Sequence, residues 1–251
     1  MRNNFLNGLP IGVANTLPGI SGGTIALILG IYDDLVQAIK KMDWRYLLPV
    51  GSGIAVGIIS TSFLTSYLFA TYPNEVLSFL LGLIAISTLI LVKKEQVYNR
   101  TSFIWLILGL LVSYIMANIE IGIRWKSVQF PLYFLGGFIS TGAMILPGVS
   151  GATSLVILGI YDEVIHAVTV FDLHILVPFG LGVILGFGIF ASFISYLLTK
   201  QRTRTMGLIV GLIVGSLPAL WPKWSFYGVL LFILGGLAAY FLRARSKTEN
   251  K

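Results

Sequence analysis

The chain has 251 residues, of which 56% are hydrophobic and only 11% are charged, and its mean hydropathy is +0.90. A soluble domain carries roughly 25% charged residues, so this composition excludes an ordinary soluble enzyme, a disordered protein and a nucleic-acid-binding protein. The 17 Lys and Arg residues outnumber the 10 Asp and Glu residues, and in a membrane protein such an excess indicates orientation, because basic residues stay on the cytoplasmic side.

The first segment of the chain, residues 5–39, is apolar but interrupted. Residues 18–24 read PGISGGT and break the helical pattern, because proline lacks an N–H and glycine tolerates unusual backbone angles. The arm before this break is too short to cross a bilayer comfortably. We therefore predict a broken or re-entrant helical hairpin with its tip near mid-membrane, buried in protein or lining a wet cavity.

The rest of the chain repeats this organisation. Apolar runs at residues 46–71, 76–92 and 102–119 follow the first segment, and a second interrupted segment, 131–168, precedes runs at 175–199, 205–221 and 226–242. Residues 17–33 (LPGISGGTIALILGIYD) match residues 146–162 (LPGVSGATSLVILGIYD) at 12 of 17 positions, at an offset of 129. We predict an all-α polytopic membrane protein of two repeats, residues 1–129 and 130–251, each with one hairpin and three transmembrane helices.

The basic residues distinguish between two topologies. If each interrupted segment returns to its own side, 14 of the 17 Lys and Arg residues share one side, whereas a single crossing splits them 10 to 7. The first arrangement places both termini in the cytoplasm. The two repeats are then inverted relative to one another, as in many secondary transporters.

The tips of the two interrupted segments carry groups that bind anions. A helix starting at Ser21 would present free N–H groups and the positive end of its dipole to a ligand. Gly22 and Gly23 would let the ligand approach the backbone, and hydroxyl groups would donate hydrogen bonds. The predicted phosphate site comprises Asn15, Gly19, Ser21, Gly22, Gly23, Thr24, Gly148, Ser150, Gly151 and Thr153. The alternative is that the small residues serve helix packing alone.

Acidic residues repeat as well. The candidates for ion coupling or gating are Asp33, Asp34, Asp162 and Glu163. A continuous helix from Ser21 would carry Asp33 about 18 Å from the tip, close to the membrane interface. An interfacial helix-end charge is therefore the alternative to a coupling site, or to a gate in which the acid pairs with Lys40, Lys41 or Arg45.

One predicted external loop is basic. It holds Arg124 and Lys126 beside Trp125. The two cations could capture an anionic head group, and the alternative is an interfacial anchor made by the tryptophan and lysine.

The doubled motif resembles that of the bacterial polyprenyl-phosphate transporters, formerly known only as a domain of unknown function. The resemblance rests on L-P-G-[IV]-S-G-[GA]-T and G-I-Y-D at residues 17–34 and 146–163 and extends over essentially the whole chain. The one departure within the first motif is that Gly23 becomes Ala152. The resemblance implies a plasma-membrane flippase that returns undecaprenyl phosphate from the outer to the cytoplasmic leaflet for reuse in cell-envelope synthesis, with the phosphate bound at the two motifs.

Two other functions stay open from the sequence. A transporter of a small soluble anion would need a sealed cavity, and a membrane enzyme acting on lipid phosphates would need an acid/base or nucleophile cluster that the sequence lacks. Without cysteine or a Walker motif we expect no cofactor and no metal, and transport coupled to a proton or sodium ion. The expected partners are polyprenyl phosphate and the bilayer, with no nucleic acid, and a homo-oligomer stays open.

Overall fold

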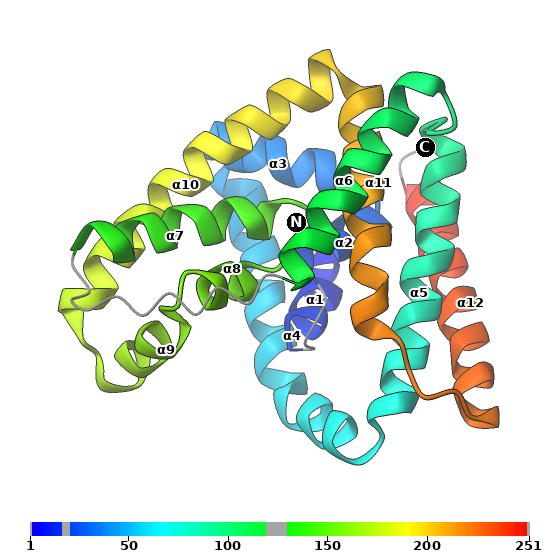
Figure 1. Cartoon of the computed structure of the whole chain (residues 1–251), viewed down its shortest axis with the longest axis horizontal. Coiled ribbons are helices and arrows are strands. Elements are labelled where there is room, and N and C mark those ends of the chain that lie inside the picture. Colours follow the sequence, from blue (N-terminus) through cyan, green and yellow to red (C-terminus); the bar gives the residue numbers. More distant parts are fainter. Residues whose placement is uncertain (1, 17–20, 119–129, 250–251) are drawn as a thin grey trace.

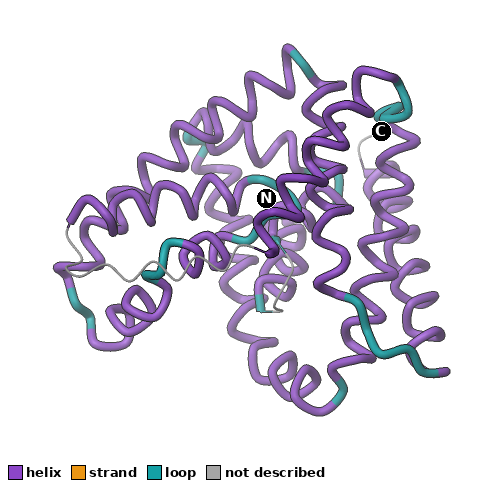
Figure 2. The backbone as a smooth tube through the Cα atoms, viewed as in Figure 1, coloured by secondary structure: helices purple, strands orange, loops and turns teal. Residues whose placement is uncertain are grey.

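The computed structural model describes residues 2–16, 21–118 and 130–249. In these ranges the chain is helical, with no strand (Figure 2). The first half contains α1 (Arg2–Asn15), α2 (Gly22–Ile28), α3 (Tyr32–Lys41), α4 (Trp44–Thr71), α5 (Pro73–Lys94) and α6 (Arg100–Asn118). The second half contains α7 (Phe130–Ile145), α8 (Gly151–Ile157), α9 (Tyr161–Val170), α10 (Leu173–Lys200), α11 (Arg202–Ser216), the 3-10 turn η1 (Leu217–Leu220) and α12 (Phe226–Glu249).

Several helices are long and apolar enough to cross a membrane. Four qualify by length and composition, namely α4, α5, α10 and α11 extended by η1, and the bent pair α8–α9 would make a fifth. The described apolar stretches of α6 and α12, which lie on two of the six predicted spans, are shorter. Large side chains such as Ile59 and Phe63 of α4 are 80% and 86% exposed, which suits a lipid environment and not water. The prediction of an all-α polytopic membrane protein is therefore confirmed.

Both interrupted segments break twice rather than once. The predicted continuous helix from Ser21 to Asp33 is wrong, because α2 ends at Ile28 and a separate helix begins at Tyr32. Gly30, with φ +75°, ends the helix in the left-handed region, and the next N–H, of Ile31, donates back to the carbonyl of Ala26 at 3.0 Å.

The second segment ends its first short helix in the same way. Gly159 has φ +69°, and the N–H of Ile160 donates to the carbonyl of Leu155 at 3.1 Å. The axes of α8 and α9 consequently differ by 113°.

The long helices pack in four close pairs. The α1–α4 and α7–α10 pairs form within each half, and the α5–α12 and α6–α11 pairs join the halves (Figure 1). Glycine permits this closeness: a Cβ on Gly211 of α11 would lie 2.1 Å from the carbonyl oxygen of Leu106 on α6. Each pair has a counterpart at the offset of 129, because α1, α4, α5 and α6 correspond to α7, α10, α11 and α12.

The two short motif helices occupy different environments. Helix α2 lies at the centre of the molecule and contacts α1, α3, α5, α7 and α12, whereas α8 contacts its sequence neighbours α7 and α9 (Figure 1). Leu27 of α2 is 7% exposed, and its counterpart in α8, Val156, is 56% exposed. The same sequence motif is therefore a core element in one half and a surface element in the other.

Glycine contacts between the halves provide a test of the fold. The substitution Gly211→Ala should destabilise the protein by about 1–3 kcal/mol, because a methyl group would push α6 away from α11. The control is Gly188→Ala in α10, where nothing lies within 4 Å of the added Cβ, and which should be neutral or stabilising by up to about 1 kcal/mol. Thermal unfolding in detergent measures both, and equal midpoints for the two variants would contradict the close α6–α11 contact.

Candidate functional site

A cavity of about 340 Å³ lies where the two motif copies meet. Its size falls within the roughly 300–1,000 Å³ range of small-molecule sites. The lining residues come from both motifs and from the ends of α6 and α11 with η1: Ser21, Ser113, Met116, Gly148, Val149, Ser150, Thr153, Val156, Ile157, Ser216 and Ala219. The structure thus brings together four of the ten predicted phosphate-site residues, and it adds Ser113 and Ser216, which no sequence motif marked.

Ser21 is the most informative residue of this cavity. It holds the N-cap position of α2, as predicted, but its side chain makes no capping hydrogen bond. The residue is only 7% exposed, and among the described residues its buried hydroxyl oxygen has no hydrogen-bond partner. A buried polar group without a partner costs about 1–3 kcal/mol, so a hydrogen bond from this hydroxyl to a ligand would recover that cost.

The second motif contributes hydroxyls in a different state. Ser150 is the N-cap of α8, and its Oγ accepts a hydrogen bond from the N–H of Thr153 at 3.5 Å. Thr153 itself is exposed. The cavity therefore combines one buried free hydroxyl from α2 with two more accessible ones from α8.

Thr24 connects the two motif copies. Its Oγ1 accepts a hydrogen bond from the N–H of Gly148 at 2.9 Å, and its side chain is 3% exposed. Gly148 needs to be glycine, because it has φ +83° and its Cα lies against the backbone of Ile213 in α11. Thr24 thus lies behind the cavity wall, where it positions a lining residue.

Three motif glycines lie close to neighbouring helices. A Cβ on Gly22 would lie 2.9 Å from Oδ1 of Asn15, and one on Gly23 would lie 3.1 Å from the carbonyl oxygen of Ile145. Gly151 similarly faces a carbonyl of α7, at 2.8 Å. These glycines and Asn15 lie outside the cavity lining, whereas the motif glycine Gly148 is part of it. Their placement agrees with a helix-packing role, and ligand binding at them stays a prediction.

Three of the predicted site residues, Gly19, Arg124 and Lys126, lie outside the described residues.

The two short helices α2 and α8 have seven residues each, and are therefore shorter than the helical arm that the sequence predicts after each break. Their dipoles are correspondingly short, so hydroxyl donors carry more of the site than predicted.

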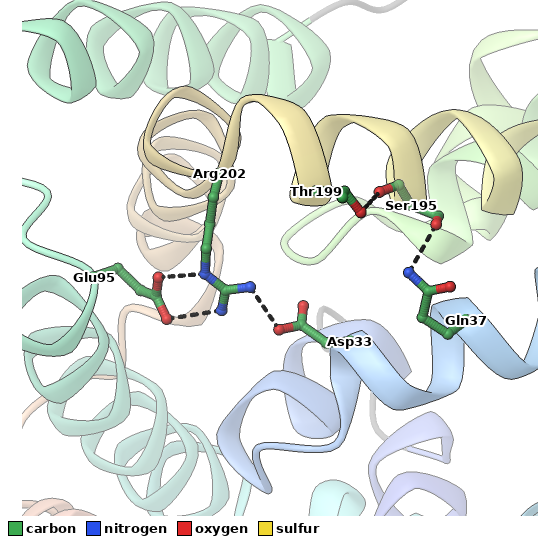
Figure 3. A network of polar contacts seen from close by, with 6 residues as sticks. All are labelled: Asp33, Gln37, Glu95, Ser195, Thr199 and Arg202. Carbon is green, nitrogen blue, oxygen red and sulfur yellow. Dashed lines mark hydrogen bonds and ion pairs between the residues drawn. The ribbon is translucent and has the colours of Figure 1, made fainter.

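A network of charged side chains lies at the start of α11, at the end of this helix that is away from the cavity (Figure 3). Arg202 donates from Nη1 to Asp33 at 2.8 Å, and from Nε and Nη2 to the two carboxylate oxygens of Glu95 at 2.8 Å and 3.0 Å. The expected gate partners of Asp33, all within its own half, are replaced by an arginine from the other half. Sequence spacing gave no signal for this pair, because 169 positions separate the two residues.

A second contact holds α3 against α10. The Gln37 Nε2 group donates to Oγ of Ser195 at 2.9 Å, and Lys40 Nζ lies 3.5 Å from the same oxygen (Figure 3). Together with Arg202, these contacts attach α3 to the α10–α11 corner.

The other candidate acids lie at the surface. Asp34, Asp162 and Glu163 are exposed. The position that corresponds to Arg202 at the offset of 129 is Pro73, so Asp162 has no equivalent arginine. The ion-pair network around Asp33, which joins the two repeats, therefore has no counterpart around Asp162.

Comparison with known proteins identifies relatives over nearly the whole chain. The VCA0040-like family, described as undecaprenyl phosphate translocase-like, matches residues 11–46 and 36–230. A polyprenyl-phosphate transporter of Vibrio cholerae is 32% identical over 88% of this chain and 77% of its own length. A polyprenyl-phosphate transporter of Staphylococcus aureus is 30% identical over 99% of this chain and 98% of its own length. No solved structure matches the chain.

The link between the motifs predicts a structural role for Thr24. The substitution Thr24→Val should lower the free energy of unfolding by about 1–3 kcal/mol, because the buried N–H of Gly148 loses its acceptor. Thr24→Ser keeps the oxygen and should remain close to the wild type. Thermal unfolding of the two variants tests the contact, and equal destabilisation by both would show that the methyl group, and not the hydrogen bond, matters.

Proposed function

Because the chain belongs to the undecaprenyl phosphate translocase-like family, we propose that it carries polyprenyl phosphate across the membrane with the phosphate in the cavity between the two motifs. It is a transporter and not an enzyme, as its relatives are. The observation that carries the site assignment is the buried Ser21 hydroxyl: it has no hydrogen-bond partner within residues 2–16, 21–118 and 130–249, and Ser21 lines a cavity together with Ser150 and Thr153.

The chemistry of the cavity suits a phosphate that must later leave. Hydroxyl groups donate hydrogen bonds to an anion, each worth about 1.5–3 kcal/mol when the acceptor is charged. Among the described lining residues there is no Lys or Arg, so the groups that these residues offer to an anion are neutral hydrogen-bond donors. Neutral donors provide recognition, while the absence of a strong ion pair in the described lining keeps release fast.

We propose that the two halves form inverted repeats with both termini in the cytoplasm, and that they rock to move the site between leaflets. The equivalent helix pairs and the asymmetric distribution of basic residues support this arrangement. On this topology, transport returns the lipid from the outer to the cytoplasmic leaflet for reuse. Coupling to a proton or sodium ion is part of the proposal, since the sequence has no Walker motif.

The geometry favours an outward-facing state. Ser216 of the cavity and Arg202 of the ion-pair network stand at opposite ends of α11, about 21 Å apart at helical rise. The predicted topology puts Arg202 on the cytoplasmic side, so the cavity lies toward the outer leaflet and the network closes the cytoplasmic end. In this proposal Asp33 is a gate residue, released when the halves rock.

The site assignment predicts that Ser21→Ala lowers polyprenyl-phosphate transport about ten-fold or more, because one hydrogen bond to the phosphate is lost. The variant should fold as well as the wild type, since this hydroxyl has no hydrogen-bond partner in the part of the chain that the structure describes. Ser150→Ala/Thr153→Val should behave in the same direction. A leaflet-exchange assay in reconstituted vesicles measures the rates.

The matched control is Ser60→Ala on α4, where the hydroxyl is exposed and bonds to its own helix at Val56. It should transport normally. Wild-type rates in both the Ser21 variant and the Ser150/Thr153 variant would refute the phosphate site while leaving the transport function in place.

The gate predicts a shift in the conformational equilibrium. Arg202→Gln removes both ion pairs. Pairs of this kind are worth about 0.2–1 kcal/mol each, so the ratio of outward- to inward-facing molecules should fall about two- to thirty-fold. The chain has no cysteine, so a cysteine introduced as Ala219→Cys in the cavity reports accessibility to an impermeant thiol reagent added outside.

Arg204→Gln is the charge-matched control, because Arg204 bonds only to the neutral Gln201 among the described side chains. Its labelling rate should equal that of the parent protein. Identical rates in the Arg202 and Arg204 variants would contradict a gating role for the network.

A further inference from the structure

A second and larger cavity lies on the other side of α2. Its volume is about 790 Å³, and α1, α2, α4, α5 and α12 enclose it. The wall consists mainly of aliphatic and aromatic side chains, among them Leu9, Val13, Ile25, Ile28 and Leu64. A cavity of this size and composition accommodates a hydrocarbon chain.

The two threonine hydroxyls in this cavity are already hydrogen-bonded and need no polar ligand. The hydroxyl of Thr61 donates to the carbonyl of Gly57 at 2.5 Å, and that of Thr65 donates to the carbonyl of Thr61 at 2.9 Å. Tyr72 and Glu75 line the cavity where α4 turns into α5. The hydroxyls facing the interior are thus already satisfied within their own helix.

The N-cap residue of α2 lines the polar cavity, and the helix itself lines the apolar one. Ser21, at its start, faces the polar cavity, and Ile25, one turn later, lines the apolar one, about 6 Å further along the helix. A ligand with an anionic head and an apolar chain fits this pair of neighbouring environments, and neither environment alone suits it.

We infer that the 790 Å³ cavity is the binding subsite for the isoprene units next to the phosphate, with the remainder of the chain in the bilayer. This inference rests on the proposed function, and it assigns to repeat 1 the recognition of the prenyl chain. Family membership indicates which lipid is carried. The position of the two cavities at the start of α2 indicates where the chain of that lipid lies.

The second repeat shows what closes such a cavity. At the offset of 129, Thr61 corresponds to Phe190. The Phe190 ring packs on Phe138 with centroids 4.9 Å apart, and its atoms lie 2.5 Å from where a Cβ on Gly142 would be. The residues equivalent to Phe138 and Gly142 are Leu9 and Val13, both in the wall of the open cavity.

The repeats differ at all three of these positions, since Leu9, Val13 and Thr61 correspond to Phe138, Gly142 and Phe190. Thr61 lines the open cavity in repeat 1, whereas its counterpart Phe190 packs against Phe138 and Gly142 in repeat 2. The small side chain at position 61 and the central position of α2 both contribute to the open cavity.

The test is Thr61→Phe, which introduces the residue that fills the second repeat. We expect the Kd for undecaprenyl phosphate to rise at least ten-fold and transport to fall with it. Ser66→Phe is the control, since Ser66 lies on the same helix, is exposed and is outside the cavity lining; its Kd should stay within two-fold of the wild type. Native mass spectrometry of the purified protein with added undecaprenyl phosphate measures binding.

Where Thr61→Phe alone does not fold, Val13→Gly/Thr61→Phe reproduces the packing of Gly142 and Phe190 and carries the same expectation. Wild-type binding by a folded cavity-filled variant would overturn the inference. The inference would also be overturned if the variant lost phosphatidylglycerol binding to the same extent, because the cavity would then be a general lipid site. A change in oligomeric state with unchanged binding of undecaprenyl phosphate would overturn it as well. The proposed function is tested separately, by transport in vesicles. It fails if the wild-type protein moves no polyprenyl phosphate there, whatever the binding experiment shows.

Discussion

A helix that breaks inside a membrane must find partners for its freed N–H and C=O groups within the protein, because hydrocarbon offers none. Both interrupted segments meet this requirement with the same device, a left-handed glycine that lets the following N–H bond back to the helix it has left. At the first break of the second segment, the N–H of Gly148 pairs with the hydroxyl of Thr24 from the other half. This contact links the two motifs where residues of both line the cavity.

The two motif copies are nearly identical in sequence and unequal in environment. Helix α2 is enclosed by five other helices, whereas α8 lies at the surface. One serine is consequently buried without a hydrogen-bond partner among the described residues, and its counterpart is engaged in a cap. An alternating-access protein built from two repeats has to be asymmetric in any single state, since the repeats exchange roles as the site moves from one side to the other. Unequal burial of equal motifs is what such a state requires.

Charge and polarity are separated along the molecule. Hydroxyls line the cavity at one end of α11, and Arg202 joins Asp33 and Glu95 at the other. The two cavities are neighbours along the chain, because Ser21 lines the polar one and Ile25 lines the apolar one. Among the described lining residues, hydroxyl groups and not cations would contact an anionic head, and the apolar cavity would bury part of a long chain.

The sequence by itself determined the membrane class, the repeat, the broken segments and the motif serines, because these depend on composition and on local backbone chemistry. Glycine and proline interrupt a helix wherever they occur, and apolar runs have one stable environment. Only the tertiary structure decided which motif is buried, that three motif glycines lie close to neighbouring helices, and that Asp33 pairs with Arg202. Several of those outcomes depend on contacts between residues more than 100 positions apart, such as Asp33 with Arg202 and Gly23 with Ile145. Others depend on side-chain volumes, such as that of Thr61 against Phe190, which acquire a meaning only when the helices are packed together.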